Sequence, residues 1–178
     1  MQNDMHKDHE LIRKFQNGDS KSFDKLVRAY LPQMMGFFIK ITNDRMLAED
    51  LCQDVFLKLF KYLKKFRFES TFKTYLYRIN INTANTWITR NKWRNILGLD
   101  KVPEPTQLNQ DIERDWKQIE LKEAISRLPK KQRSVVLLRV NDEFSYSQIS
   151  EITGMSEATA KVNFHHAKKK LIEIINEK

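Results

Sequence analysis

The 178-residue chain has one cysteine, four glycines and four prolines, so it is poor in the residues that cross-link or turn a fold. Cys52 alone cannot form an internal disulfide, which points to a reducing compartment and excludes a disulfide-stabilised scaffold. One thiol and four histidines also cannot build a typical Cys/His zinc site. Because sheets need many turns rich in Gly and Pro, their shortage favours long helices with few connections.

Long apolar runs are also missing. No stretch approaches the roughly 18 uninterrupted apolar residues of a membrane-spanning helix, and the N-terminal residues have no apolar core of signal-peptide length. The sequence shows no paired carboxylates, nucleophile with a base, Gly-rich phosphate loop or metal-binding cluster. We therefore expect a soluble, cytoplasmic protein that is not an enzyme and has no cofactor or metal, with enough apolar residues, 40%, for a packed core.

The positive charge is concentrated in one segment. Of the net charge of +9, residues 61–94 carry +8, whereas residues 1–60 are neutral and residues 95–178 carry +1. Residues 61–94 also hold eight of the 19 aromatic side chains. Cations attract phosphates and aromatic faces stack on unpaired bases, so this segment suits a single strand or an opening duplex. A helix with a basic outer face and an aromatic core face explains the composition equally well.

Apolar residues recur at helical spacing through the first part of the chain. The pattern predicts a helix capped by Ser20 and bent or broken at Pro32, and a second helix from Asn43-Asp44 to Phe66. In the second helix we interpret one apolar seam as core, with Cys52 as a small buried neighbour. The seam consists of Leu51, Val55 and Leu59.

A further helix, capped by Ser70 or Thr71, is expected from Phe72 to about Trp93. Residues 95–111 follow with little periodicity, one glycine and two prolines, and form the best linker candidate. The overall prediction is an all-α chain of two small helical domains, residues 1–94 and 112–178, joined by this flexible linker.

The C-terminal part has the pattern of a helix-turn-helix. A short apolar helix ends at Gly154, and a longer helix capped by Ser156 follows after a tight turn. Gly154 is expected to take the left-handed backbone that other residues resist. Alone, this pattern favours DNA binding, although helical hairpins with a glycine turn are common.

Three ordered segments carry a family resemblance: AEDLCQDVFLKLF (48–60), FRFESTFKTYLYRININTA (66–84) and AISRLPKKQRSVVLLRVNDEFSYSQISEITGMSEATAKVNFHHAKKKL (124–171). Together they resemble the extracytoplasmic-function (ECF) sigma factors of bacterial RNA polymerase, a two-domain group of the sigma-70 family. The resemblance runs from about residue 8 to 175. It implies that the first domain binds core polymerase and the −10 promoter element, and that the second binds the −35 element and the β flap.

The resemblance also implies which residues of the first domain act. The core-polymerase contact, at the β′ clamp helices, would be Asp50, Gln53, Asp54 and Lys58, which otherwise form a plain solvated face. The segment that reads and melts the −10 element would include Phe66, Arg67, Ser70, Thr71, Phe72, Lys73, Tyr75, Arg78 and Asn82.

Opening a duplex requires a pocket that offsets the cost of unstacking a base. The loop 67–70 can line such a pocket with small polar groups, and three rings would supply stacking faces: Phe66, Phe72 and Tyr75. Lys73 and Arg78 would hold phosphates, and Asn82 would bind a base edge or the backbone, while Tyr77 and Trp87 suit the core. The family often has Gly where Phe68 stands and Trp near Tyr75, so its −10 sequence should not be transferred.

In the helix-turn-helix, the resemblance implies contacts to the −35 element from Arg133, Tyr146, Ser147, Ser156, Thr159, Lys161, Val162, His165, His166 and Lys168. Of these, residues 161, 162, 165 and 166 match positions that face the major groove, and residues 133, 146, 147 and 168 would contact phosphates. Asn163 stands where the family often has Arg, a strong guanine reader, so we expect a divergent −35 element. The histidine pair allows either pH-sensitive DNA binding or a plain surface role.

The expected partners are core RNA polymerase, promoter DNA and, by the resemblance, a membrane-linked anti-sigma factor, without insertion of this chain into the membrane. The alternative is a homodimeric helix-turn-helix repressor or activator. That alternative predicts tight palindrome binding without polymerase, whereas a sigma factor binds weakly alone and initiates specifically with core enzyme. A nuclease would need an acidic metal-binding cluster, which the sequence does not show.

Overall fold

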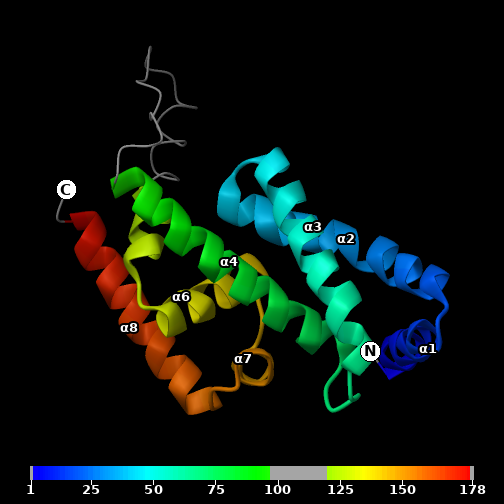
Figure 1. Ribbon diagram of the computed structural model, residues 1–178. Coiled ribbons are helices and arrows are strands. Elements are labelled where there is room, and N and C mark those ends of the chain that lie inside the picture. Colours follow the sequence, from blue (N-terminus) through cyan, green and yellow to red (C-terminus); the bar gives the residue numbers. More distant parts are fainter. Residues whose placement is uncertain (1, 97–119, 177–178) are drawn as a thin grey trace. The chain divides into compact units, whose positions relative to one another are not determined.

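A computed structural model describes residues 2–96 and 120–176, and these contain helices, turns and bends without a strand (Figure 1). The all-α prediction is therefore confirmed for the described residues. Contacts divide the chain into two compact units, residues 1–84 with 151–154, and residues 85–150 with 155–178. The predicted linker 95–111 lies outside the described residues from position 97 onward, and the functional domain boundaries remain a prediction.

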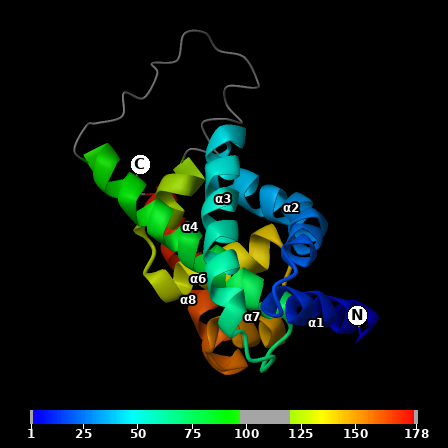
Figure 2. The ribbon, with the colours of Figure 1, turned by 45° about the vertical axis from the view of Figure 1, so that its right-hand side comes forward.

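The first unit contains α1 (Gln2–Gln16), α2 (Ser20–Thr42), α3 (Arg45–Tyr62), the short 3-10 helix η1 (Leu63–Lys65) and the beginning of α4 (Phe72–Ile96). α2 and α3 run side by side, as both ribbon views show (Figures 1 and 2). Asn43, in the left-handed conformation, ends α2, and the Asp44 carboxylate then accepts a hydrogen bond from the Leu47 amide at 3.1 Å. The predicted helix start at 43–44 is confirmed, whereas the α-helix ends at Tyr62 and not at Phe66, because the chain continues as the 3-10 helix η1.

The start of α2 differs from the prediction by one residue. Asp19, not Ser20, is the N-cap, since its carboxylate accepts hydrogen bonds from the Lys21 amide at 3.0 Å and the Ser22 hydroxyl at 2.6 Å. A carboxylate and a hydroxyl can both cap a helix, so sequence alone ranks the two neighbours poorly.

α2 continues through Pro32 without interruption, so the break that was one of the two predicted outcomes does not occur. Proline costs roughly 3 kcal/mol in a helix interior because it lacks a hydrogen-bond donor and clashes with the preceding turn. Pro32 itself is exposed, whereas Leu26, Met34 and Phe37 on either side of it are buried. Burial of such side chains contributes about 1.5–3 kcal/mol each, which offsets the cost.

The apolar seam of α3 packs into the core as expected. Leu51, Val55 and Leu59 are buried, and Cys52 beside them is 2% exposed and donates a hydrogen bond to the Met35 sulfur at 3.6 Å. Burial, with a smaller effect from Glu49, raises the pKa of the Cys52 thiol to about 12. Cys52 is thus a small core residue.

We predict that native Cys52 reacts with a thiol reagent at pH 8 at least about 100-fold more slowly than in the unfolded chain, because the thiolate is the reactive form. An unfolded cysteine ionises near pH 8.5, below the pKa of the folded thiol, so its contribution to stability is full below pH 8.5 and falls as the pH rises further. Ellman's reagent with and without urea measures the first effect. Rapid labelling of native protein would contradict a buried thiol.

The second unit contains the helical residues 120–127, α6 (Lys130–Val136), the π-helical turn η2 (Leu137–Asn141), most of α7 (Tyr146–Thr153) and α8 (Glu157–Asn176). Leu128, Val136 and Ala167 form a buried cluster, against which Ile125, Phe164 and Leu171 pack. This cluster holds α8 against the preceding helices.

The turn between α7 and α8 has the expected chemistry. Gly154 has φ +74°, in the left-handed region, and the Ser156 hydroxyl accepts a hydrogen bond from the Thr159 amide at 3.1 Å. Both local predictions for the helix-turn-helix are confirmed.

Candidate functional site

The predicted polymerase-binding residues of α3 are all exposed. They are Asp50, Gln53, Asp54 and Lys58. The Lys58 amino group donates a hydrogen bond to the Thr83 hydroxyl at 2.9 Å, which steadies it on the surface of the same unit. The exposure leaves these side chains accessible to a partner, and their role remains a prediction.

An apolar surface adjoins this polar face, and sequence reasoning did not find it. Leu57 is 70% exposed and Phe60 is 44% exposed. They line a shallow hollow of about 310 Å³ with Phe23, Gln53 and Phe56. The partly exposed Phe60 ring also packs against the rings of Phe15 at 5.3 Å and Phe23 at 5.2 Å. Leu57, which stands outside the apolar seam, was the available signal for exposed apolar surface on α3.

Two of the three predicted stacking rings are buried. Phe72 is 2% exposed and meets the Tyr30 ring edge-on at 5.0 Å, and Phe66 is also in the core. The structure therefore contradicts an open stacking face on Phe66 or Phe72. Tyr75 is only half-buried, with its ring 5.0 Å from that of Phe66, and burial raises the pKa of its hydroxyl. Tyr75 is the ring of the three that keeps an accessible part.

The loop before α4 is polar and partly fixed. Arg67 is exposed and lies 3.9 Å from the Glu69 carboxylate, and Ser70 is half-buried. The Thr71 hydroxyl accepts a hydrogen bond from the Thr74 amide at 3.1 Å and shares another with the Thr74 hydroxyl at 2.9 Å. Thr71 is therefore the cap of α4, one of the two predicted alternatives.

Phe68 in this loop has φ +60°, a left-handed conformation that costs a side chain roughly 1–2 kcal/mol. Glycine takes this conformation without that cost. The position at which the family often has glycine thus has a glycine-like backbone here, although a phenylalanine occupies it.

On α4, Lys73, Arg78 and Asn82 are exposed. Tyr75, Arg78 and Asn82 are spaced by three and four residues, so they share one face of the helix. Arg78 donates hydrogen bonds to the carbonyls of Glu151 at 3.0 Å and Ile152 at 3.2 Å, residues of the same unit. Tyr77 is fully buried and Trp87 partly so, in line with their assignment to the core. Lys92 and Arg94, part of the concentrated charge, lie outside the described side chains.

The outer face of α8 presents most of the predicted −35 residues. The exposed side chains are Ser147 on α7, Ser156 in the turn, and Thr159, Lys161, Val162, His165, His166 and Lys168 on α8. The hydroxyls of Ser156 and Thr159 share a hydrogen bond at 2.8 Å, so they also stabilise the helix start. Val162, an aliphatic side chain on this face, is 53% exposed.

Tyr146 is half-buried, and two cations lie near its ring. The guanidinium of Arg139 lies 5.2 Å from the ring centre and the amino group of Lys161 lies 5.8 Å from it. The Phe164 ring packs against the same tyrosine at 6.2 Å. Arg139, in the π-helical turn, was not among the residues predicted from the sequence, since no motif marks it.

Arg133 does not match its prediction as a phosphate contact. The side chain is 5% exposed, and its guanidinium donates to the Asn85 side-chain oxygen at 2.7 Å, the Thr89 hydroxyl at 3.1 Å and the Ser126 carbonyl at 3.2 Å. Burial lowers the pKa of this guanidinium. With its donors taken by protein acceptors, Arg133 is a structural residue in this arrangement.

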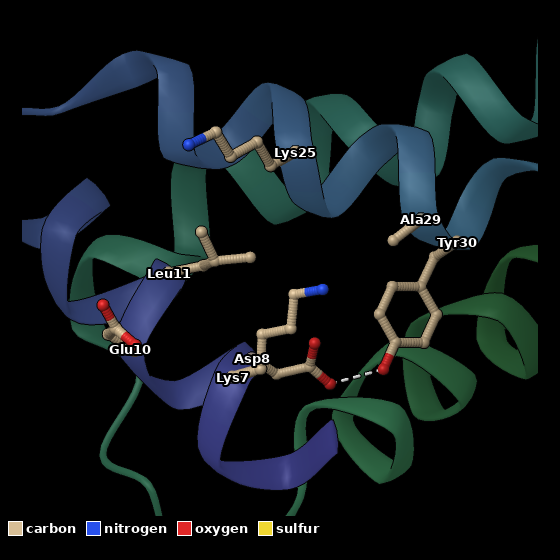
Figure 3. A pocket seen from close by; sticks show the side chains of 7 residues that line it. All are labelled: Lys7, Asp8, Glu10, Leu11, Lys25, Ala29 and Tyr30. Atoms are coloured by element: carbon tan, nitrogen blue, oxygen red, sulfur yellow. Dashed lines mark hydrogen bonds between the residues drawn. The ribbon is translucent and has the colours of Figure 1, made fainter. Parts of the chain in front are cut away.

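A second hollow, of about 520 Å³, lies between α1 and α2 (Figure 3). The Tyr30 hydroxyl donates a hydrogen bond to the Asp8 carboxylate inside it, and Lys7 and Lys25 also contribute to its lining. Among the described residues, no group of three or more His, Cys, Asp or Glu side chains could hold a metal ion. No helix in the described ranges is long and apolar enough to span a membrane.

Comparisons with known proteins cover most of the chain. Two family models match, sigma-70 region 2 at residues 26–94 and sigma-70 region 4 at residues 118–171. The RNA polymerase sigma-H factor of Pseudomonas aeruginosa is 29% identical over 174 residues, 90% of each chain. The RNA polymerase sigma factor YlaC of Bacillus subtilis is 30% identical over 155 residues, which are 84% of this chain and 90% of that protein. The ECF RNA polymerase sigma-E factor of Haemophilus influenzae is 29% identical over 178 residues.

Two solved structures have a similar fold. CnrH, in complex with the cytosolic domain of CnrY, superimposes with a TM-score of 0.64 at 17% identity and covers 97% of this chain and 99% of that one. The sigma factor RpoE of Bartonella quintana, in complex with the anti-sigma factor NepR, gives a TM-score of 0.55 at 24% identity, over 88% of this chain and 98% of that one.

Proposed function

Since this chain belongs to the extracytoplasmic-function sigma factors of bacterial RNA polymerase, we propose that its three exposed surfaces divide the work of promoter-specific initiation among them. As a sigma factor it binds core polymerase, recognises the −10 and −35 elements and promotes DNA melting. The observation that carries this function is the ordered match to regions 2 and 4 of the family. This membership sets aside the homodimeric repressor, and the chain acts as an initiation factor without catalysis of its own.

The first surface, on α3, binds the β′ clamp helices of core polymerase. Its support is the exposure of Asp50, Gln53, Asp54 and Lys58 and the adjoining apolar hollow around Leu57. Interfaces typically combine a buried apolar centre with a polar rim. The hollow would supply the apolar contact, and the two carboxylates would fix the orientation of the partner.

The second surface, formed by the loop 67–70 and one face of α4, captures and holds the opened −10 strand. Tyr75 offers the accessible ring, Asn82 a polar group for a base or the backbone, and Arg78 with Lys73 the charge for phosphates. Arg78 would exchange its two carbonyl partners for phosphate oxygens, which form stronger, charge-assisted hydrogen bonds. Arg67 and Ser70 line the loop, whereas Phe66, Thr71 and Phe72 support it from inside the fold.

The third surface, on α8, reads the −35 element in the major groove. Lys161, Val162, His165 and His166 would face the bases, and an exposed valine suits contact with a thymine methyl group. Lys168 and Ser147 would contact phosphates, with Tyr146 beside them. The β flap is the expected polymerase partner of this part of the chain.

An anti-sigma factor is the remaining partner that we propose. RpoE of Bartonella quintana, which shares the fold, is held in complex with the anti-sigma factor NepR. A membrane-linked protein of this kind would retain the present chain in the cytoplasm until a signal releases it to core polymerase.

We predict that Tyr75→Ala slows open-complex formation about tenfold, because one base stacked on an aromatic ring contributes roughly 1–3 kcal/mol. Transcription reconstituted with core polymerase on promoters found by chromatin mapping, with permanganate footprinting of the opened strand, measures this step. Tyr75→Phe is the matched control, since it keeps the ring. Equal loss of opening and of core affinity in folded Tyr75→Ala protein would refute base capture. Absence of any promoter-dependent transcript from the wild-type holoenzyme would refute the function itself.

A further inference from the structure

We propose that helix α1 positions the loop 67–70 and thereby sets how strictly the sigma factor selects the −10 base. The contact consists of His9, Arg13 and Gln16 on α1 and Phe68 in the loop, and we call these four residues the loop clamp. The proposal rests on the proposed role of the loop in base capture and assigns positioning residues to it. All four residues belong to the first unit.

Gln16 fixes the start of the loop. Its side-chain amide nitrogen donates hydrogen bonds to the carbonyl oxygens of Leu63 at 2.9 Å and Phe66 at 3.0 Å. The Phe66 amide also donates to the Leu63 carbonyl at 3.1 Å, which closes the turn that leads into the loop. A glutamine amide has two hydrogens to donate, and here both form hydrogen bonds to backbone carbonyls directly before the loop.

Phe68 fixes the middle of the loop. Its ring meets the His9 ring edge-on at 5.1 Å and the Phe66 ring at 5.1 Å, and the guanidinium of Arg13 lies 5.2 Å from its centre. Edge-on aromatic pairs and a cation over a ring are both attractive arrangements. These contacts hold a non-glycine residue in its left-handed backbone, where local preference alone would not keep it.

The clamp reaches the accessible stacking ring through one intermediate. Phe66 lies between Phe68 and Tyr75, 5.1 Å from the first ring and 5.0 Å from the second. A shift of Phe68 would therefore move the ring that supports Tyr75 as well as the polar residues Arg67 and Ser70. Base selection requires pocket groups held in place before the base arrives, because a loose pocket adapts to several bases.

The first test measures the loop in the full-length free protein. Gln16→Leu removes the two donated hydrogen bonds, and Phe68→Gly removes the ring while leaving a residue that accepts the left-handed backbone. In both variants we expect the Phe66 amide, which donates to the Leu63 carbonyl at the start of the loop, to exchange its hydrogen about tenfold faster than in wild type, because its support from Gln16 or from the Phe68 ring is lost. Lys14→Gln is the matched control on the same helix, since Lys14 is exposed and pairs with Glu10. Unchanged exchange in both folded variants would overturn the clamp.

The second test measures selection by the holoenzyme on a promoter pool randomised in the −10 element. For both variants, we expect the preference for the best base over the next to fall about tenfold, with core affinity unchanged, and Lys14→Gln should behave as wild type. Faster exchange with unchanged selection would also overturn the proposal. Arg67→Ala with Ser70→Ala separates the two levels of inference. If the double variant selects the −10 base as strictly as wild type, the proposed role of the loop is refuted. If the double variant loses base preference but Gln16→Leu and Phe68→Gly do not, only the role of the loop clamp is refuted.

Discussion

Reversing both acidic charges of the α3 face, Asp50→Lys with Asp54→Lys, is expected to weaken binding to core polymerase by about 100-fold or more. The two carboxylates are exposed and lie four residues apart, so they point to one side of the helix. In the proposed complex they leave water and meet the clamp helices, and a like charge placed at a desolvated contact costs several kcal/mol. In the free protein the same exposure makes the reversal nearly neutral for stability.

Titration of labelled variant into core polymerase at two ionic strengths measures this effect. Asp24→Lys is the control, because Asp24 is an exposed acid on α2 outside the proposed surface. Screening by salt weakens charge interactions, so the difference from wild type should shrink at the higher ionic strength. The apolar hollow around Leu57 should leave a part of the binding that salt does not affect. Equal weakening by Asp24→Lys would mean that net charge, not this face, controls the association.

Phe72→Ala is expected to lower the free energy of unfolding of the first unit by about 3–5 kcal/mol, the usual cost of deleting a buried phenylalanine ring. Phe72 is the first residue of α4, and its ring packs against Tyr30 of α2, so the substitution leaves a cavity where these helices meet. Both core binding and promoter opening should fall together in this variant.

Urea unfolding followed by circular dichroism gives the size of the effect. Tyr75→Ala is the comparison, since its half-exposed ring should cost clearly less, in the common range of about 0.5–3 kcal/mol for single substitutions. A loss below about 1 kcal/mol for Phe72→Ala would place its ring outside the core and restore it as a candidate for stacking on a base.

The sequence of the −10 segment does not predict that the Phe72 ring is buried while the Tyr75 ring stays partly accessible. The concentration of charge and aromatics in residues 61–94 located the segment, and the ordered motifs gave its family. Phe72, Tyr75 and Tyr77 lie within six residues, however, and helical spacing alone does not say which side of α4 the rest of the protein covers. Only packing against α2 separates the buried rings from the accessible one.

The sequence by itself determined what depends on neighbours within three or four residues. The caps at Asp44 and Ser156 and the left-handed turn at Gly154 each use hydrogen bonds or backbone preferences of that range, so the local sequence predicts them. The choice between two neighbouring cap residues, as at Asp19 and Thr71, came only with the structure. The same holds for the all-helical class, since few turn residues and regular apolar spacing are properties of the chain itself.

The tertiary structure decided what depends on residues far apart in the chain. From the sequence, Arg133 is predicted to contact a phosphate. In the folded protein its guanidinium donates hydrogen bonds to acceptors 44 and 48 residues away. No sequence pattern marks Gln16, and its role follows only from the hydrogen bonds that its amide donates to carbonyls 47 and 50 residues away. Such contacts form because burial of apolar surface brings distant segments together, and the polar groups that come along must then find partners inside the fold.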